Sequence, residues 1–185
     1  MKIVCLTQHK RVEAEKLRGA INNKLTGTIR LNRSRMDYQE KFEQMIAEYN
    51  AGTIGVADYF EKLFDFVNDL NEEDQRARTE ELSEEELAVF DLLTQPEPHL
   101  TAPEQSEVKD AVKEMLETLK QENLGLDWRK HTQTRAQVRL AVGNILDKGL
   151  PQPYTPELFN QKSEAVYQHI YDSYYGEGKS IYAEN

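Results

Sequence analysis

Residues 71–93 read NEEDQRARTEELSEEELAVFDLL, and this stretch decides the fold class. Ser83 and Glu86 have the spacing of a capping box, in which two side chains bond backbone N–H groups at the start of a helix. Beyond this start, nonpolar residues recur at helical spacing and are expected to face a core: Leu87, Phe90 and Leu93. The stretch therefore predicts a charged helix that ends before Ser83 and a second helix that begins there.

The same periodicity extends toward the N-terminus, and no convincing alternation typical of strands appears. Three nonpolar stripes mark three helices: Leu17, Ile21, Leu25 and Ile29; Met36, Phe42, Ile46 and Tyr49; and Val56, Phe60, Leu63, Val67 and Leu70. Gly19 and Gly27 interrupt the first stripe, so this helix is expected to be weak or frayed. The chain is therefore predicted to be all-α, an irregular helical bundle of about six to eight helices.

Start signals recur in the C-terminal half. Thr101 and Glu104 repeat the capping-box spacing. Thr155 is a suitable N-cap, followed by Pro156 at the first helical position, where a missing N–H costs nothing. The helix that begins there is expected to end at Gly176.

Charge is unevenly distributed along the 185 residues, whose formal net charge is −10. Residues 1–41 hold ten Lys and Arg against four Asp and Glu, a net of +6, which leaves −16 for the rest. We therefore predict a basic helical arm, residues 1–35, which is the end of a preceding helical segment, and a C-terminal helical domain, residues 36–185. The arm either attracts a polyanion or belonged to the surface of another domain in a longer chain.

The composition also indicates the cellular compartment in which the protein is expected. With 38% hydrophobic and 30% charged residues the chain is typical of soluble globular proteins. No nonpolar run approaches the roughly 20 residues that span a bilayer, and no secretory signal is present, so we expect a cytoplasmic protein without membrane contact. The single cysteine, Cys5, cannot form an internal disulfide, which agrees with a reducing compartment.

No grouping of residues typical of catalysis or metal binding can be read. Gly178, Lys179 and Ser180 match the end of a P-loop, but the first glycine of that motif is Ser173 here. Glu177 and Lys179 imitate part of a nuclease site without the further carboxylate and the rigid support that a metal needs. The histidines lie too far apart for metal-ligand spacing: His9, His99, His131 and His169. We therefore predict no catalytic residue, no metal and no cofactor in this chain.

The sequence LDWRKHTQTRAQVR, residues 126–139, is the strongest candidate site. Its helix begins either at Trp128 or, with the spacing of Thr134 and Gln137, later. The stretch is basic in an acidic chain, and its cations are Arg129, Lys130, Arg135 and Arg139. An arginine at the edge of a nonpolar stripe can stack on an aromatic ring and present its fork to phosphate or carboxylate. The alternative is that acidic helices of the same chain neutralise these cations.

Two further groups of candidates follow. With the arm, the predicted DNA- or anion-binding set comprises Arg129, Lys130, Arg135, Arg139, Arg30, Arg33 and Arg35. In the last helix, Tyr167, Tyr171 and Tyr174 form a stripe beside the nonpolar one, and tyrosine suits both an interface and a broad core face. Together with Trp128 they are the predicted protein interface.

Four stretches carry a family resemblance: NRSRMDYQEKFEQMIAEYNAG, ELSEEELAVFDLL, LDWRKHTQTRAQVR and LPQPYTPELFNQKSEAVYQHIYDSYYGEG. In this order they resemble the helical C-terminal region of the R subunit of type I restriction enzymes, over residues 16–183. None of that family's nuclease or motor motifs lies in this chain. Trp128, Arg129, Lys130, Arg135 and the segment 167–175 match the family pattern without an assigned role.

The resemblance implies a larger parent protein. Such an R subunit carries a nuclease domain and two helicase-like motor domains, and it uses ATP and Mg²⁺ to translocate and cut DNA. Its C-terminal region is associated with docking onto the modification core of M and S subunits. The expected role here is therefore assembly with that core and contact with double-stranded DNA that does not read sequence. The alternative is a regulatory domain that binds a nucleotide or another anion through Trp128, Arg129, Arg135 and Arg139.

Overall fold

The computed structural model describes residues 2–183, with side chains from Lys10 onward. This range contains seven α-helices, a short 3-10 helix, a π-helical turn and one small two-stranded hairpin. The predicted all-α class is thus confirmed, with the hairpin as a minor addition. No helix within residues 2–183 is both long and nonpolar enough to cross a membrane.

Packing divides the chain into two compact units, Met1–Glu81 and Leu82–Asn185. Each unit has its own hydrophobic residues, and each is described here by itself. The charge pattern predicts a different division, into a basic arm of residues 1–35 and a domain of residues 36–185. That division assigns residues 1–35 to the end of a preceding helical segment, and it stays a prediction.

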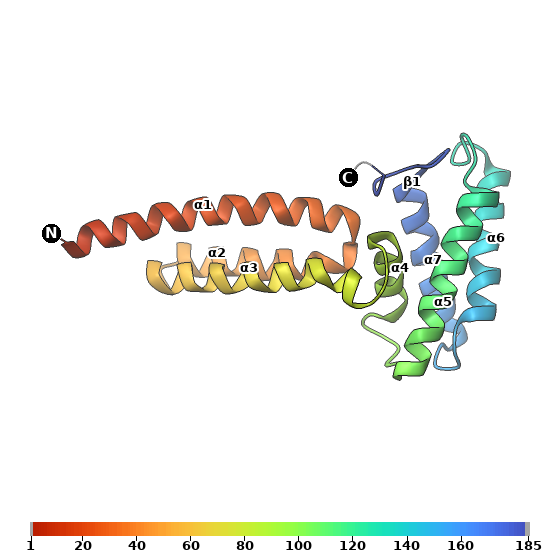
Figure 1. The fold of residues 1–185 in the computed structure, drawn as a ribbon, viewed down its shortest axis with the longest axis horizontal. Helices are drawn as coiled ribbons and strands as arrows, with labels where there is room; N and C mark the ends of the chain where they lie inside the picture. The colour runs from red at the N-terminus through yellow and green to blue at the C-terminus, as the bar shows by residue number, and fades with distance from the viewer. Residues whose placement is uncertain (1, 184–185) are drawn as a thin grey trace. The chain divides into compact units, whose positions relative to one another are not determined.

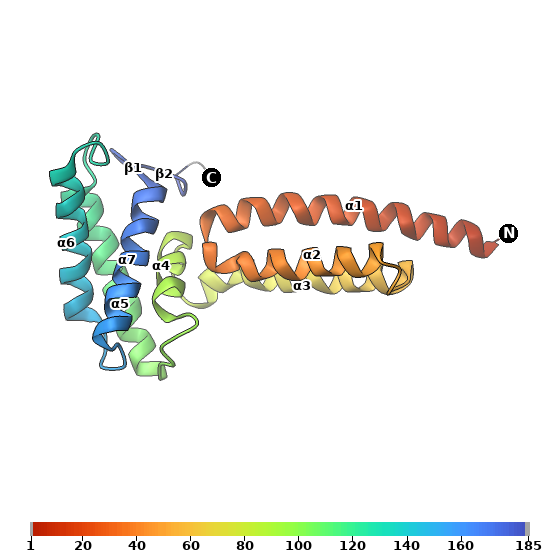
Figure 2. The ribbon, with the colours of Figure 1, turned by 180° about the vertical axis from the view of Figure 1, so that it is seen from behind.

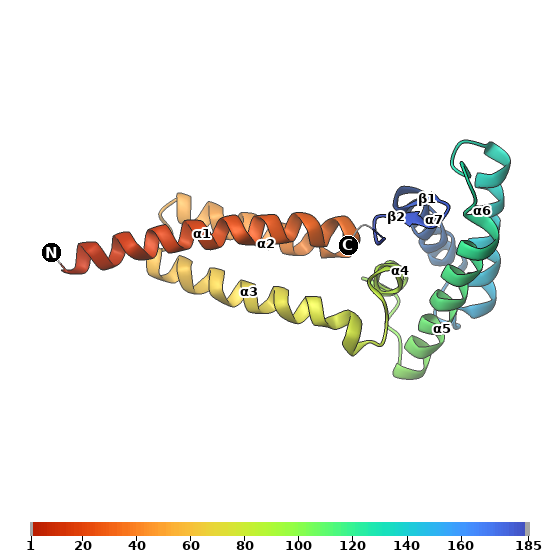
Figure 3. The same ribbon diagram turned by 45° about the horizontal axis from the view of Figure 1, so that its top comes forward.

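The first unit contains three long helices, α1 (Lys2–Leu31), α2 (Met36–Asn50) and α3 (Val56–Thr79), with a 3-10 turn, Arg33–Arg35, between the first two. Helix α1 lies along α3, as Figures 1 and 3 show. The predicted stripes supply five buried residues of the core of this unit: Ile21, Leu25, Phe42, Leu63 and Leu70. Ala14, Tyr59 and Phe66 complete the core without having been predicted, whereas the predicted Met36 is 53% exposed. Helix α1 continues unbroken through Gly19 and Gly27, so the predicted fraying is not seen.

The second unit contains α4 (Glu84–Thr94), α5 (Ala102–Thr118), α6 (Thr132–Gly149) and α7 (Pro156–Ser173). Helix α5 continues into a π-helical turn, Leu119–Asn123. The short helix α4 packs against α5 and α7, and α6 packs against the same two helices. Residues 87–90 of α4 are nonpolar and all buried, and the carboxylate of Asp91, which follows them, is buried as well. Figure 2 shows α4, α6 and α7 from behind, with both strands of the hairpin after α7.

The predicted helix starts are confirmed. The backbone N–H of Ser83 donates to the Glu86 carboxylate at 2.7 Å, and the N–H of Glu86 donates to Ser83 Oγ at 3.3 Å. At the start of α5 the Glu104 carboxylate accepts from the N–H of Thr101 at 2.7 Å. These bonds hold the pKa of Glu104 below its ordinary value. Local sequence therefore determines where these two helices begin.

The predicted end of the last helix was wrong. Helix α7 stops at Ser173, and the chain continues as an antiparallel hairpin, β1 (Tyr174–Gly176) with β2 (Lys179–Ser180). Glu177 and Gly178, at the turn, both have positive φ, 53° and 74°. The P-loop-like residues 178–180 therefore form a hairpin turn and its second strand.

Candidate functional site: the Arg129 surface

The candidate site begins in the turn that precedes α6. Trp128, Arg129 and Lys130 lie in this turn, and α6 begins at Thr132, between the two predicted starts. Thr134 therefore lies in the first turn of the helix and is not its N-cap. Thr134 Oγ1 donates to the backbone carbonyls of Trp128 at 2.6 Å and His131 at 3.0 Å. A side chain in the first turn of the helix thus holds the preceding loop in place.

Trp128 is a core residue of the second unit. Its side chain is 1% exposed, and its indole N–H donates to the carbonyl of Tyr174 at 3.2 Å. Its ring meets that of Tyr171 edge-on, with centroids 5.9 Å apart. A partner or a nucleotide base cannot reach this ring, so the structure does not favour the predicted role of Trp128 in an interface.

Arg129 extends from this turn over two tyrosine rings. Its guanidinium carbon lies 4.6 Å from the ring centroid of Tyr171 and 5.4 Å from that of Tyr175. No carboxylate of the described residues lies within ion-pair distance of it, although residues 82–185 hold eighteen Asp and Glu. The two rings restrict the guanidinium without neutralising its charge.

Two residues with large nonpolar side chains in this region are exposed to solvent: Leu126, three positions before Arg129 in the chain, and Tyr175, whose ring Arg129 contacts. Leu126 is 68% exposed and Tyr175 is 40% exposed. We use the name Arg129 surface for Leu126, Arg129, Lys130, Tyr171 and Tyr175. It combines a stacked cation with exposed nonpolar area, a composition typical of residues that dominate binding energy at interfaces.

The other predicted cations of this stretch have partners within the chain, and Lys130 among them stays exposed. Lys130 Nζ lies 2.8 Å from the Asp127 carboxylate, in an exposed ion pair. Arg135 donates to the carbonyl of Arg129 at 2.7 Å and to Thr132 Oγ1 at 3.1 Å. Arg135 therefore stabilises the turn.

Arg139 is also bound within the chain. Its guanidinium carbon lies 4.3 Å from the ring centroid of Tyr167, and its Nη2 lies 3.0 Å from the Glu164 carboxylate. Arg139 keeps 57% of its side chain exposed in this pair, so the alternative nucleotide site stays a prediction, although Trp128 is buried and Arg135 is bonded to the turn.

The arginines of the arm separate into two kinds. Arg30 and Arg33 have exposed side chains. Arg35 is 3% exposed, and its Nε lies 2.9 Å from the Glu73 carboxylate, which Arg76 also approaches at 3.3 Å. The prediction that Arg35 binds DNA is therefore corrected, because this residue joins the start of α2 to α3 inside the unit.

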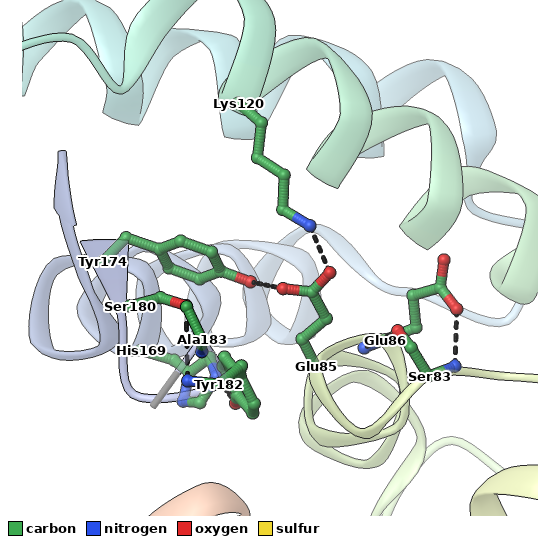
Figure 4. A network of polar contacts seen from close by, with 9 residues as sticks. All are labelled: Ser83, Glu85, Glu86, Lys120, His169, Tyr174, Ser180, Tyr182 and Ala183. Atoms are coloured by element: carbon green, nitrogen blue, oxygen red, sulfur yellow. Dashed lines mark hydrogen bonds and ion pairs between the residues drawn. The ribbon is translucent and has the colours of Figure 1, made fainter. Parts of the chain in front are cut away.

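The three predicted tyrosines do not form one surface. Tyr167 and Tyr174 are buried, and Tyr171 is half-buried. The Tyr174 hydroxyl donates to Glu85 at 2.9 Å, and Glu85 also pairs with Lys120, as Figure 4 shows. Burial, followed by the nearby Glu85, raises the pKa of Tyr174, so its hydroxyl remains a donor. Tyr174, which the sequence predicts in the interface, is thus buried, whereas Tyr175 is the exposed residue beside Arg129.

The remaining polar groups of this region hold the hairpin in place. His169 Nε2 and the Tyr182 hydroxyl are 2.8 Å apart, and both residues appear in Figure 4. No group of three or more His, Cys, Asp or Glu with the geometry of a metal site occurs among residues for which side chains are described. Cys5 and His9 lie outside those residues.

A family model described as "Type I restriction enzyme HindI endonuclease subunit-like, C-terminal" matches residues 1–174. The chain belongs to this family of C-terminal domains of type I restriction enzyme endonuclease subunits, as the resemblance of its four stretches predicted.

Two curated relatives of the chain are named as endonuclease subunits of type I restriction enzymes. A Methanocaldococcus jannaschii protein, named as the MjaIXP endonuclease subunit of a type I restriction enzyme, is 23% identical over 137 residues, which cover 74% of this chain and 13% of the relative. The HindI endonuclease subunit of Haemophilus influenzae is 25% identical over 130 residues, 70% of this chain and 12% of the relative. The matched region is thus about an eighth of each relative. No solved structure matches the chain.

Proposed function

We propose that this domain serves assembly and DNA contact in a type I restriction enzyme. It docks the endonuclease subunit onto the modification core of M and S subunits and contacts double-stranded DNA without reading its sequence. The parent protein supplies translocation and cleavage with ATP and Mg²⁺. The proposal assigns no catalytic step and no cofactor to the residues of this chain.

Arg129 carries the DNA part of the proposal. A guanidinium that lies on two rings and has no ion pair among the described residues is suited to a phosphate oxygen. The exposed Lys130, Arg30 and Arg33 are further candidates, each at the surface of its own unit. Because residues 82–185 hold ten Lys and Arg against eighteen Asp and Glu, a net of −8, the contact should be local, weak and strongly dependent on salt.

Exposed nonpolar area supports the assembly part. Arg129 contacts the exposed Tyr175, and the exposed Leu126 precedes it by three positions in the chain. Arginine and tyrosine are enriched among residues that contribute most to protein interfaces. A protein partner would cover Leu126 and pair Arg129 with a carboxylate. During translocation DNA phosphate could replace that carboxylate, since both anions suit the same planar fork.

The test of assembly uses the full-length endonuclease subunit that contains this chain. Leu126→Asp and Arg129→Ala should each weaken its binding to purified M and S subunits by about tenfold or more, the usual scale of a central interface residue. Lys113→Ala, on the exposed face of α5, is the matched control. Unchanged assembly of a subunit from which the whole domain is deleted would refute this role.

A further inference from the structure

A second surface lies along the outer face of α6. Five exposed residues there carry no charge, between Arg139 at one edge and Lys148 near the end of the helix: Gln133, Ala136, Gln137, Leu140 and Asn144. Leu140 is 64% exposed. Charge depletion around an exposed leucine is typical of the centre of a protein interface. This neutral face leads, one turn after Asn144, to Asp147.

A cleft of about 370 Å³ opens beside Asp147, where the chain turns from α6 into α7. Its nonpolar lining includes Leu150, Pro151, Tyr154, Pro156 and Phe159. The Tyr154 hydroxyl donates to the carbonyl of Leu93 at 3.2 Å, which orients the ring, and the prolines restrict the backbone. The cleft is therefore largely preformed.

Asp147 is the only formally charged residue among the described residues that line this cleft. It lies in the last turn of α6, where the negative end of the helix dipole makes a carboxylate unfavourable. Its exposed side chain forms no ion pair with any residue of the described range. The Asp147 carboxylate is therefore available to a cation at the mouth of this cleft.

We propose that this cleft binds an arginine or lysine side chain presented by a protein partner. The cationic head pairs with the Asp147 carboxylate, and the aliphatic stem lies on the rings of Tyr154 and Phe159. A nonpolar residue of the same partner covers Leu140, two turns earlier on α6. The 18 residues of α6, about 27 Å at 1.5 Å per residue, separate this site from the Arg129 surface. The inference therefore does not depend on the function proposed for that surface.

The test is a titration of the 185-residue chain with N-acetyl-L-arginine amide, followed through backbone amide NMR shifts. Saturable shifts confined to residues 144–160 are expected. N-acetyl-L-norleucine amide, which has the stem without the charge, should bind much more weakly. Asp147→Asn should weaken arginine binding by about tenfold, the scale of one charge-assisted hydrogen bond.

Glu157→Gln is the matched control, because Glu157 is an exposed acid of the same region outside the lining of the cleft. It should leave arginine binding unchanged. Asp147→Asn should also leave the melting temperature unchanged or raise it, which excludes misfolding as the cause of lost binding. Equal binding of the norleucine and arginine amides, or unchanged arginine binding by Asp147→Asn, would overturn the proposal.

Discussion

The indole N–H of Trp128 and the backbone carbonyl of Tyr174 are 3.2 Å apart, although 46 residues separate them in sequence. This bond joins the turn before α6 to the C-terminal hairpin. A second link is the N–H of Glu177, which donates to the carbonyl of Leu124 at 3.2 Å. Arg129 follows Trp128 in the turn, and Tyr175 follows Tyr174 in the hairpin. The Arg129 surface therefore forms only while the hairpin lies on the turn.

Gly176→Ala should disrupt this arrangement. A Cβ at Gly176 would lie 2.4 Å from the carbonyl oxygen of Gly125, and the φ of 94° is itself unfavourable for alanine. We expect a loss of about 1–3 kcal/mol in the free energy of unfolding, measured with urea. Gly178→Ala is the control, because its φ is also positive, 74°, but its Cβ would meet no neighbour. Equal losses for the two variants would show that the close approach at Gly125 is unimportant.

Arg35→Ala should affect stability and not DNA affinity. Removing Arg35 leaves Glu73 buried with Arg76 as its remaining cation, so the loss should stay below the about 3–5 kcal/mol that an uncompensated buried charge typically costs. Thermal unfolding measures this loss. Arg33→Ala, in the same 3-10 turn but exposed, should cost much less. If Arg35→Ala weakened DNA binding while leaving the melting temperature unchanged, the assignment of Arg35 to the protein interior would be contradicted.

Gly19→Ala and Gly27→Ala should each stabilise α1. A Cβ at either position would meet nothing within 4 Å, and alanine in a helix interior is favoured over glycine by about 0.5–1 kcal/mol. The midpoint of urea unfolding should rise for both variants. Gly149→Ala should instead destabilise the protein, because its Cβ would lie 2.6 Å from that of Ala111. A lower midpoint for Gly19→Ala would mean that this helix bends or packs there.

The capping bond of Glu104 predicts a dependence on pH. Its pKa is lowered in the folded state by the hydrogen bonds from Thr101. A carboxylate with a lowered folded pKa stabilises the protein above its ordinary pKa of about 4.3, and this stabilisation disappears as pH falls through the folded value. Glu104→Ala should therefore lower the melting temperature at pH 7 and have little effect near pH 2. A difference that persists undiminished at pH 2 would contradict the account.

The sequence predicted local features of the fold well. The Ser83 and Glu104 signals define helix starts through bonds between residues three positions apart, so a single sequence contains all the information. The nonpolar stripes of α1, α2 and α3 likewise supply the core, including Ile21, Phe42 and Leu63. Periodicity reports which face is buried because burial follows the helical repeat.

The candidate site was harder to predict because it depends on contacts between distant segments. If α7 continued to Gly176, Tyr167, Tyr171 and Tyr174 would share one face. The helix instead ends at Ser173, and extended backbone sends successive side chains to opposite sides. Tyr174 therefore points inward to Glu85, and Tyr175 points outward beside Arg129.

The pairing of Arg35 with Glu73, across 38 positions, was equally invisible in a single sequence. The distribution of charge along the chain predicts the basic arm. It does not predict which arginines of the arm are buried. Only the packing of α2 on α3 separates Arg35 from the exposed Arg30 and Arg33. Ion pairs between residues far apart in the sequence can therefore be identified only from the structure.

Binding of the 185-residue chain to labelled duplex DNA across a salt series tests the central claim most directly. The claim is that Arg129, stacked on Tyr171 and Tyr175, contacts phosphate. The double variant Arg129→Ala/Lys130→Ala should weaken binding similarly for unrelated sequences and reduce the salt slope by about 1–2, the loss of one or two phosphate contacts. Lys113→Ala should change the slope little. Binding by the double variant with the unaltered affinity and slope, or no binding by the unaltered chain at low salt, would contradict the claim.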